Sequence, residues 1–216
     1  MKKERITLKN YTLGEELVSA ISHGFGAVLA IVCLVLCIHA SMNNGAVALA
    51  SALIYSISLF ILYLMSTLYH SLTPNKAKKV FRVFDHCSIF LLIAGSYTPF
   101  TLITLQGRTG WILCVLVWTC AIVGIVLNSI NLEKFKKISF ALYLIMGWAV
   151  IFNYKILTDA LASTGILLLI LGGITYTVGA IIYLIGKKVK YMHSIWHFFV
   201  LGGSIFHFFA IYNYVF

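Results

Sequence analysis

The sequence predicts an all-α protein, a bundle of seven transmembrane helices. Of its 216 residues, 61% are hydrophobic and only 10% are charged, and the mean hydropathy is +0.98. A soluble domain is about 45–50% apolar and about 25% charged. The apolar residues also form continuous runs of about 20 residues, the length of a spanning helix rather than of a barrel strand. Because a backbone in lipid must satisfy its own hydrogen bonds, these runs should be helices.

The runs follow one another closely, so a single membrane domain covering 1–216 is expected, with a short cytoplasmic segment at 1–16. The seven expected spans are roughly 17–39, 45–70, 84–105, 110–130, 137–157, 162–186 and 192–214. Pro99 should kink the third span because proline removes a backbone donor. The pair Gly202-Gly203 should let the seventh span approach a neighbouring helix closely.

Basic residues gather in alternate connections. Fourteen of the sixteen Lys and Arg residues lie in the N-terminal segment or in the connections after the second, fourth and sixth expected spans. They are Lys2, Lys3, Arg5, Lys9, Lys76, Lys78, Lys79, Arg82, Lys134, Lys136, Lys137, Lys187, Lys188 and Lys190. The positive-inside rule then predicts a cytoplasmic N-terminus and an extracytoplasmic C-terminus. The net charge of +10 follows this topology and indicates no nucleic-acid partner.

Histidines at the expected cytoplasmic depth are the main functional signal. His193 and His197 open the last span four residues apart, and such residues share a helix face with about 5–6 Å between their Cβ atoms. His70 ends the second span at the same depth. Three imidazoles and an open position form a catalytic type of zinc site, so these residues predict a buried Zn²⁺ site near the cytoplasmic side. A hydrogen-bonded interior role is the alternative for a lone histidine such as His70.

Two further residues lie at this depth. Asp85 begins the third span and can act as a general base on water at the zinc, although a direct ligand, a helix cap or a snorkelling carboxylate are alternatives. Ser66 lies four residues before His70 on the same face and can orient water or stabilise an oxyanion; helix packing is its alternative. We predict Asp85 and Ser66 as catalytic residues.

The other histidines are weaker candidates. His207 lies ten residues after His197, about 15 Å further along the helix, which is too far for the same ligand set. His86 points about 100° away from Asp85 around the helix. His23 is expected to be structural. The roles of all three stay open.

Four motifs resemble the progestin and adipoQ receptor superfamily. They are Ser66-xxx-His70, Asp85 with the downstream Ala94-Gly-Ser-Tyr-Thr-Pro99, Gly173-Ile-Thr-Tyr-Thr-Val-Gly179, and His193-xxx-His197. The length and the short loops resemble its bacterial branch, the hemolysin III family. This resemblance implies zinc bound by His70, His193 and His197, with Asp85 near the zinc-bound water and Ser66 beside it. It also implies a place in the bacterial plasma membrane.

Three functions are compatible with these features. The superfamily also resembles alkaline ceramidases, which implies a zinc-dependent hydrolase that cleaves a lipid amide or ester, with a membrane lipid as substrate. The name hemolysin III implies a cytolytic, pore-forming protein, although nothing else in the sequence supports this. A receptor or regulator of membrane lipid state, with structural zinc, is the third. The sequence does not indicate an oligomeric state.

Overall fold

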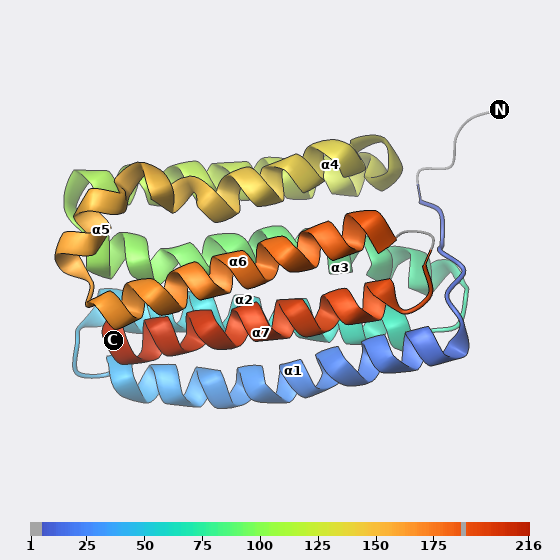
Figure 1. Ribbon diagram of the computed structural model, residues 1–216, viewed down its shortest axis with the longest axis horizontal. Helices are drawn as coiled ribbons and strands as arrows, with labels where there is room; N and C mark the ends of the chain where they lie inside the picture. The colour runs from blue at the N-terminus through green and yellow to red at the C-terminus, as the bar shows by residue number, and fades with distance from the viewer. Residues whose placement is uncertain (1–5, 187–188) are drawn as a thin grey trace.

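The computed structural model describes residues 6–186 and 189–216, and within these the protein is helical without β-strands. The helices lie side by side along the longest axis, and the C-terminus is at the opposite end from the start of α1 (Figure 1). Their bounds are α1 Leu13–Ser41, α2 Ala46–Ser71, α3 Lys76–Pro99, η1 Phe100–Leu105, α4 Gly107–Trp148, η2 Ala149–Asn153, α5 Tyr154–Ala160, α6 Ser163–Ile185 and α7 Met192–Tyr214.

Local sequence signals account for several helix ends. The Thr12 side chain accepts a hydrogen bond from the Glu15 backbone while the Glu15 carboxylate accepts one from the Thr12 backbone, which is a capping box at the start of α1. Asn75 caps α3 by accepting from the Lys78 backbone at 2.8 Å. Gly45 precedes α2 with φ of 88°, a backbone conformation that favours glycine. The starts of α1, α3 and α7 lie at the same end of the bundle (Figure 1).

Within the described residues, six helices are long and apolar enough to cross a membrane, rather than the seven predicted. The difference arises because the expected spans 110–130 and 137–157 both fall in the continuous segment Gly107–Ala160. This segment is interrupted at Asn131, whose φ of −163° and ψ of 93° are not helical. The Asn131 side chain accepts from the Lys134 backbone at 3.0 Å, as a helix N-cap does.

The two arms of α4, 107–130 and 132–148, are held together by side chains across this break. The Asn128 amide accepts a hydrogen bond from Ser139 at 2.6 Å and donates one to the Tyr143 hydroxyl at 3.4 Å. In a straight helix Asn128 and Tyr143 would be about 22 Å apart along the axis. The chain therefore turns back at Asn131, and the arms pack against each other.

Pro99 does not kink the middle of its helix. It is the last residue of α3, and the π-helical segment η1 follows directly. The wider turn suits a site where proline has removed a backbone donor. Thr101 is buried there and donates to the Tyr97 carbonyl at 2.9 Å. The expected close approach at Gly203 is confirmed, since a Cβ at this position would meet the Tyr176 ring at 2.8 Å.

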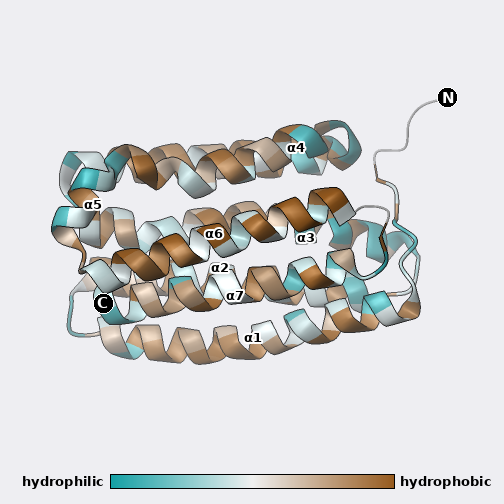
Figure 2. Ribbon diagram, in the orientation of Figure 1, coloured by the Kyte–Doolittle hydropathy of each residue, from teal (hydrophilic) through white to brown (hydrophobic). Residues whose placement is uncertain are grey.

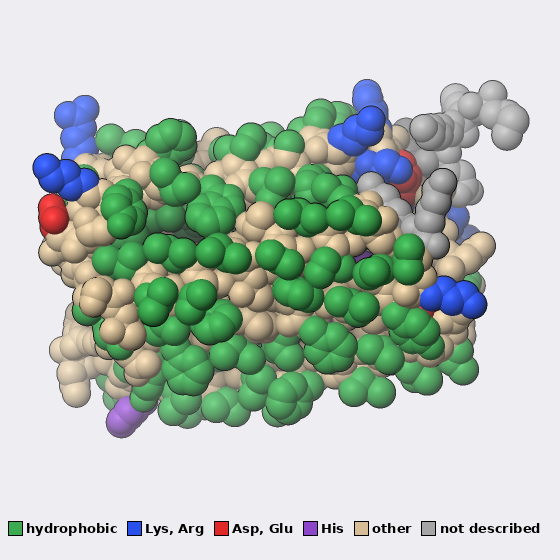
Figure 3. All heavy atoms as spheres, in the orientation of Figure 1, with side chains coloured by type: hydrophobic (Ala, Val, Ile, Leu, Met, Phe, Trp, Pro, Cys, Tyr) green, Lys and Arg blue, Asp and Glu red, His purple; other side chains and the backbone are tan. Residues whose placement is uncertain are grey.

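The outside of the bundle is apolar and the inside is partly polar. Leu17, Ile21 and Phe25 of α1 are exposed, whereas Ser19 and His23 of the same helix are buried. Hydrophobic residues dominate the middle of the helices and hydrophilic residues gather toward their ends (Figure 2). The face in Figure 3 is covered by apolar side chains, with Lys and Arg at the two ends. This inverted arrangement is what lipid as the solvent requires.

Candidate metal centre and its cavity

The three histidines singled out in the sequence meet at one end of the bundle, which we call the histidine end. His70 comes from the last turn of α2, and His193 and His197 from the first turns of α7. His193 Nε2 lies 3.2 Å from His70 Nε2 and 3.3 Å from His197 Nε2. Zn–N bonds of about 2.0–2.1 Å in a tetrahedron place the nitrogen atoms roughly 3.3–3.4 Å apart. Both distances from His193 are close to this value, and the ligand atoms of all three residues lie within 4.8 Å of one another, so this group could hold a metal ion.

The outer nitrogen atoms of two of these rings are held by α1. His70 Nδ1 lies 2.5 Å from a Glu16 carboxylate oxygen, and His197 Nδ1 lies 3.3 Å from the Ser19 carbonyl oxygen. Both partners are acceptors, so each ring carries its proton on Nδ1 and presents the Nε2 lone pair to the shared space. Metal-binding histidines usually have such a partner. The His193 Nδ1 atom is buried without a hydrogen-bond partner among the described residues.

Glu16 also binds a buried lysine, and neither residue was selected from the sequence. Lys78 is 2% exposed, and its Nζ donates to Glu16 at 2.6 Å and to the Leu72 carbonyl at 2.8 Å. The Tyr69 ring lies 5.2 Å from the same ammonium group. A signal was available for Glu16, because Glu16, Ser19 and His23 follow the spacing of one helix face.

Asp85 lies at the histidine end but outside the close group of ligand atoms. His70, His193 and His197 form that group, with atoms within 4.8 Å of one another, among the described residues. The Asp85 side chain is buried and lies 3.2 Å from His86 Nδ1. His86 was expected to point away from Asp85, yet its ring reaches the carboxylate while also lying 2.9 Å from the Arg82 carbonyl oxygen.

Ser66, the second residue predicted to be catalytic, lies in the interior of the bundle. It is buried, and its hydroxyl has no hydrogen-bond partner within normal limits among the described residues. Asp85 and His193 line the adjoining cavity, and Ser66 is not among the described residues that do. The unpartnered hydroxyl leaves Ser66 able to bind a small polar group inside the protein.

A cavity of about 780 Å³ begins beside His193 and continues between α3, the second arm of α4, α6 and α7. Ligand pockets in proteins are about 300–1,000 Å³. Its interior is lined mainly by apolar side chains, including Leu92, Ile93 and Val200, and His207 lies toward its other end. His207 Nε2 lies 3.3 Å from the Leu169 carbonyl oxygen, and His207 is outside the three-histidine group.

Two aromatic contacts complete the centre. His23, expected to be structural, is buried with its ring centroid 3.7 Å from that of His197, and neither of its ring nitrogen atoms has a partner among the described residues. Tyr11, before α1, stacks on His193 with the centroids 4.9 Å apart. Burial raises the pKa of the Tyr11 phenol far above its ordinary value, so the ring stays neutral.

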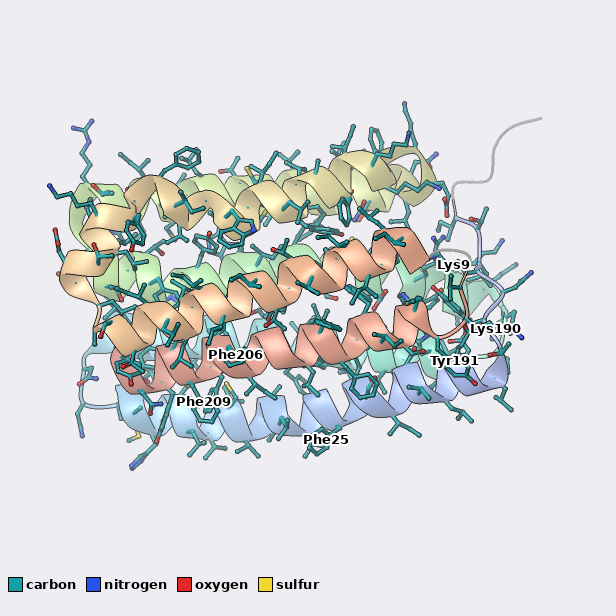
Figure 4. All side chains as sticks on the ribbon, viewed as in Figure 1. Lys9, Phe25, Lys190, Tyr191, Phe206 and Phe209 are labelled. Carbon is teal, nitrogen blue, oxygen red and sulfur yellow. The ribbon has the colours of Figure 1, made fainter. Side chains whose placement is uncertain are left out.

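The N-terminal segment 6–12 lies over this end of the cavity. Thr7 donates to Glu133 at 2.7 Å, and its carbonyl accepts from Arg82. In Figure 4, Lys9 lies near Lys190 and Tyr191 at the start of α7. Thr7 thus joins this segment to α3 and α4, and the stacking of Tyr11 on His193 joins it to α7.

Comparisons with known proteins agree on one family. The sequence profile of the family described as "Haemolysin-III related" matches residues 11–208. The chain is 46% identical to "Hemolysin-3" of Bacillus cereus over 213 residues, covering 98% of this chain and 97% of the relative. It is 45% identical to the "Hemolysin-3 homolog" of Bacillus subtilis (strain 168) over 202 residues, covering 93% and 94%. The human "Monocyte to macrophage differentiation factor" is 26% identical over 171 residues, covering 77% and 71%.

Proposed function

Because the chain belongs to the haemolysin-III related family of multi-pass membrane proteins, and because its three histidines adjoin a large apolar cavity, we propose that it is a zinc-dependent hydrolase of the bacterial plasma membrane. Its substrate is a lipid amide or ester. The spacing of 3.2 and 3.3 Å from His193 Nε2 to the other two Nε2 atoms is the observation that carries the proposal, since it is close to the nitrogen spacing around one tetrahedral ion.

The residues of the chain divide the chemistry between them. Zinc held by the three imidazoles would supply Lewis acidity, which polarises a carbonyl and makes water a nucleophile near neutral pH. Asp85 accepts a proton from the attacking water, because its carboxylate is buried beside the cavity. Ser66 donates a hydrogen bond to oxygen as charge develops. The apolar lining holds the acyl chain and excludes water.

We further infer that the chain crosses the membrane seven times, with a cytoplasmic N-terminus. The break at Asn131 supports two crossings within Gly107–Ala160. The segment of 54 residues is far longer than one crossing needs, whereas each arm has about the length of a single spanning helix. The distribution of Lys and Arg supports the orientation. Reporter fusions within 72–82 should read cytoplasmic and fusions after Phe216 extracytoplasmic. Opposite readings at both sites would reverse the topology.

Cytolysis is the second candidate, because the relative from Bacillus cereus is named Hemolysin-3. A regulator of membrane lipid state with structural zinc is the third candidate. The three-histidine cluster and the cavity suit a regulator that binds lipid as well as a hydrolase that cleaves it. The purified full chain in nanodiscs distinguishes them. Metal analysis should give one zinc per chain, and lipid amides and esters should release free fatty acid. A fully zinc-loaded protein that cleaves none of them, and yet lyses erythrocytes, would replace the hydrolase by the cytolysin.

A further inference from the structure

We propose that the histidine end of the cavity binds the anionic head group of an amphiphile, so that the substrate is an acidic lipid carrying a phosphate-type group. This inference deepens the proposed function and rests on it. It follows from the charges that line the cavity. Five cationic side chains are among its lining residues, against three carboxylates. The cations are Lys9, Arg82, Lys136, Lys137 and Lys190, and the carboxylates are Glu15, Glu133 and Asp85.

The three carboxylates already have partners within the protein. Glu15 accepts from the Thr12 and Tyr191 backbones, both at 2.8 Å. Glu133 accepts from Thr7, and it pairs with Arg82 at 2.6 Å and with Lys136 at 3.1 Å. Asp85 pairs with His86. Two cations therefore share Glu133, which leaves an excess of positive charge at this end of the cavity.

Lys137 and Lys190 contribute much of that excess. Neither forms an ion pair with another described residue. They come from the second arm of α4 and from the connection before α7, so they approach the cavity from two sides. An anion with several oxygen atoms can contact both lysines, and basic residues near a membrane surface attract anionic lipid by about 1 kcal/mol each.

Arg82 supplies an independent observation. It is only 5% exposed, and its Nη1 atom binds Glu133 and the Thr7 carbonyl. Its Nε–H, however, is buried without a partner among the described residues. A buried donor without a partner is costly, and this donor belongs to a cation that lines the cavity one helical turn before Asp85. An anionic oxygen atom is the partner such a donor prefers.

The position of this charge relative to the histidines defines the class of substrate. The rest of the cavity is mainly apolar, as at Leu92, Leu144 and Val200. Asp85 comes between Arg82 and Leu92 along α3, and His193 comes between Lys190 and Val200 along the chain. A lipid with its head group at the cations and its tail in the apolar part would therefore pass beside His193 and Asp85. The bond nearest the head group would then lie next to the metal centre.

The positive charge at the histidine end also has an explanation that needs no head-group site, because cytoplasmic connections of membrane proteins are rich in lysine. The chain itself provides a control for this. Lys76 and Lys134 lie in the same two connections as Arg82 and Lys137, yet they are not among the described residues that line the cavity. Lys134 lies against Phe135 of its own helix, 5.2 Å from the ring centroid. A head-group site requires the cavity lysines, whereas general attraction requires only charge.

Calorimetry on the purified full chain in neutral detergent tests the proposal. The probes are decyl phosphate, decyl phosphocholine with the same tail, and inorganic phosphate. Decyl phosphate should bind roughly tenfold or more tightly than decyl phosphocholine. The double variant Lys137→Gln with Lys190→Gln should weaken it by about 30-fold, since two charges of about 1 kcal/mol each are lost. The matched variant Lys76→Gln with Lys134→Gln should change it less than about twofold.

Equal losses in the two double variants would overturn the proposal in favour of general attraction. Equal affinity for the two amphiphiles would also overturn it, and inorganic phosphate binding as tightly as decyl phosphate would make this a site for free anions. These measurements need no turnover. Selective binding without hydrolysis would support the head-group site and refute the hydrolase. Equal hydrolysis of neutral and acidic lipids would support the hydrolase and refute the head-group site.

Discussion

The two ends of the bundle handle polar residues in different ways. At the histidine end, Glu16, Lys78 and Arg82 are charged side chains with little or no exposure, and each has at least one charged partner. At the opposite end, Arg108, Lys155 and Asp159 are exposed. Charged groups can stay in water at either membrane surface. Two of these residues adjoin the three histidines, since Glu16 binds both Lys78 and His70 Nδ1, and charged groups buried at such depth are usually functional.

The largest effect is expected when one of the three histidines is replaced. His197→Ala should reduce zinc from one per chain to nearly none, because two imidazoles hold the ion much less firmly than three. Elemental analysis of the purified protein measures this. His39→Ala is the matched control, since His39 is exposed near the end of α1 away from the histidines. Full zinc content in a variant lacking His70, His193 and His197 would refute the metal centre.

The second test separates binding from chemistry at the histidine end. Asp85→Asn keeps the shape of the side chain and removes the base, so hydrolysis should fall by about 10²–10⁴-fold. Zinc content should stay close to that of the wild type, because Asp85 is not in the close group of ligand atoms. Fatty-acid release and elemental analysis on the same sample measure both. Loss of zinc in this variant would make Asp85 a ligand, and unchanged hydrolysis would remove it from the mechanism.

The third test concerns the buried charges that distinguish the two ends. Glu16→Gln removes the carboxylate from His70 Nδ1 and should weaken zinc affinity about 10–100-fold. Competition with a chelator measures this without any substrate. Asp159→Asn, an exposed carboxylate at the opposite end, should leave the affinity unchanged. If the two variants hold zinc equally well, Glu16 does not position His70.

The smallest effect is expected at Ser66. Ser66→Ala should lower hydrolysis by about two- to tenfold, since one neutral hydrogen bond contributes about 0.5–1.5 kcal/mol. Zinc content and the unfolding temperature should hardly change, because the hydroxyl has no partner among the described residues that would be left unsatisfied. Initial rates of fatty-acid release measure the effect. Activity equal to that of the wild type would limit Ser66 to helix packing.

Local patterns in the sequence were enough to predict the helices and the meeting of the three histidines. The apolar runs predicted helices, and helical periodicity brought His193 and His197 to one face. The depth of each residue within its span then predicted that His70 would join them, as the structure shows. The number of helices was harder to predict, because the expected spans 110–130 and 137–157 belong to one long helical segment that is broken at Asn131.

Only the tertiary structure revealed the partners that surround the histidines. Glu16 is 54 residues from His70 and 62 from Lys78, so no local preference relates them. The distribution of Lys and Arg along the sequence predicted that Lys78 lies in a cytoplasmic connection. The packing of α1, α2 and α3 instead buries it against Glu16. Hydrophobicity and helical period were enough to predict the helices and to bring His193 and His197 to one face. The cavity and the paired charges depend on how distant helices pack, and that was decided only by the folded bundle.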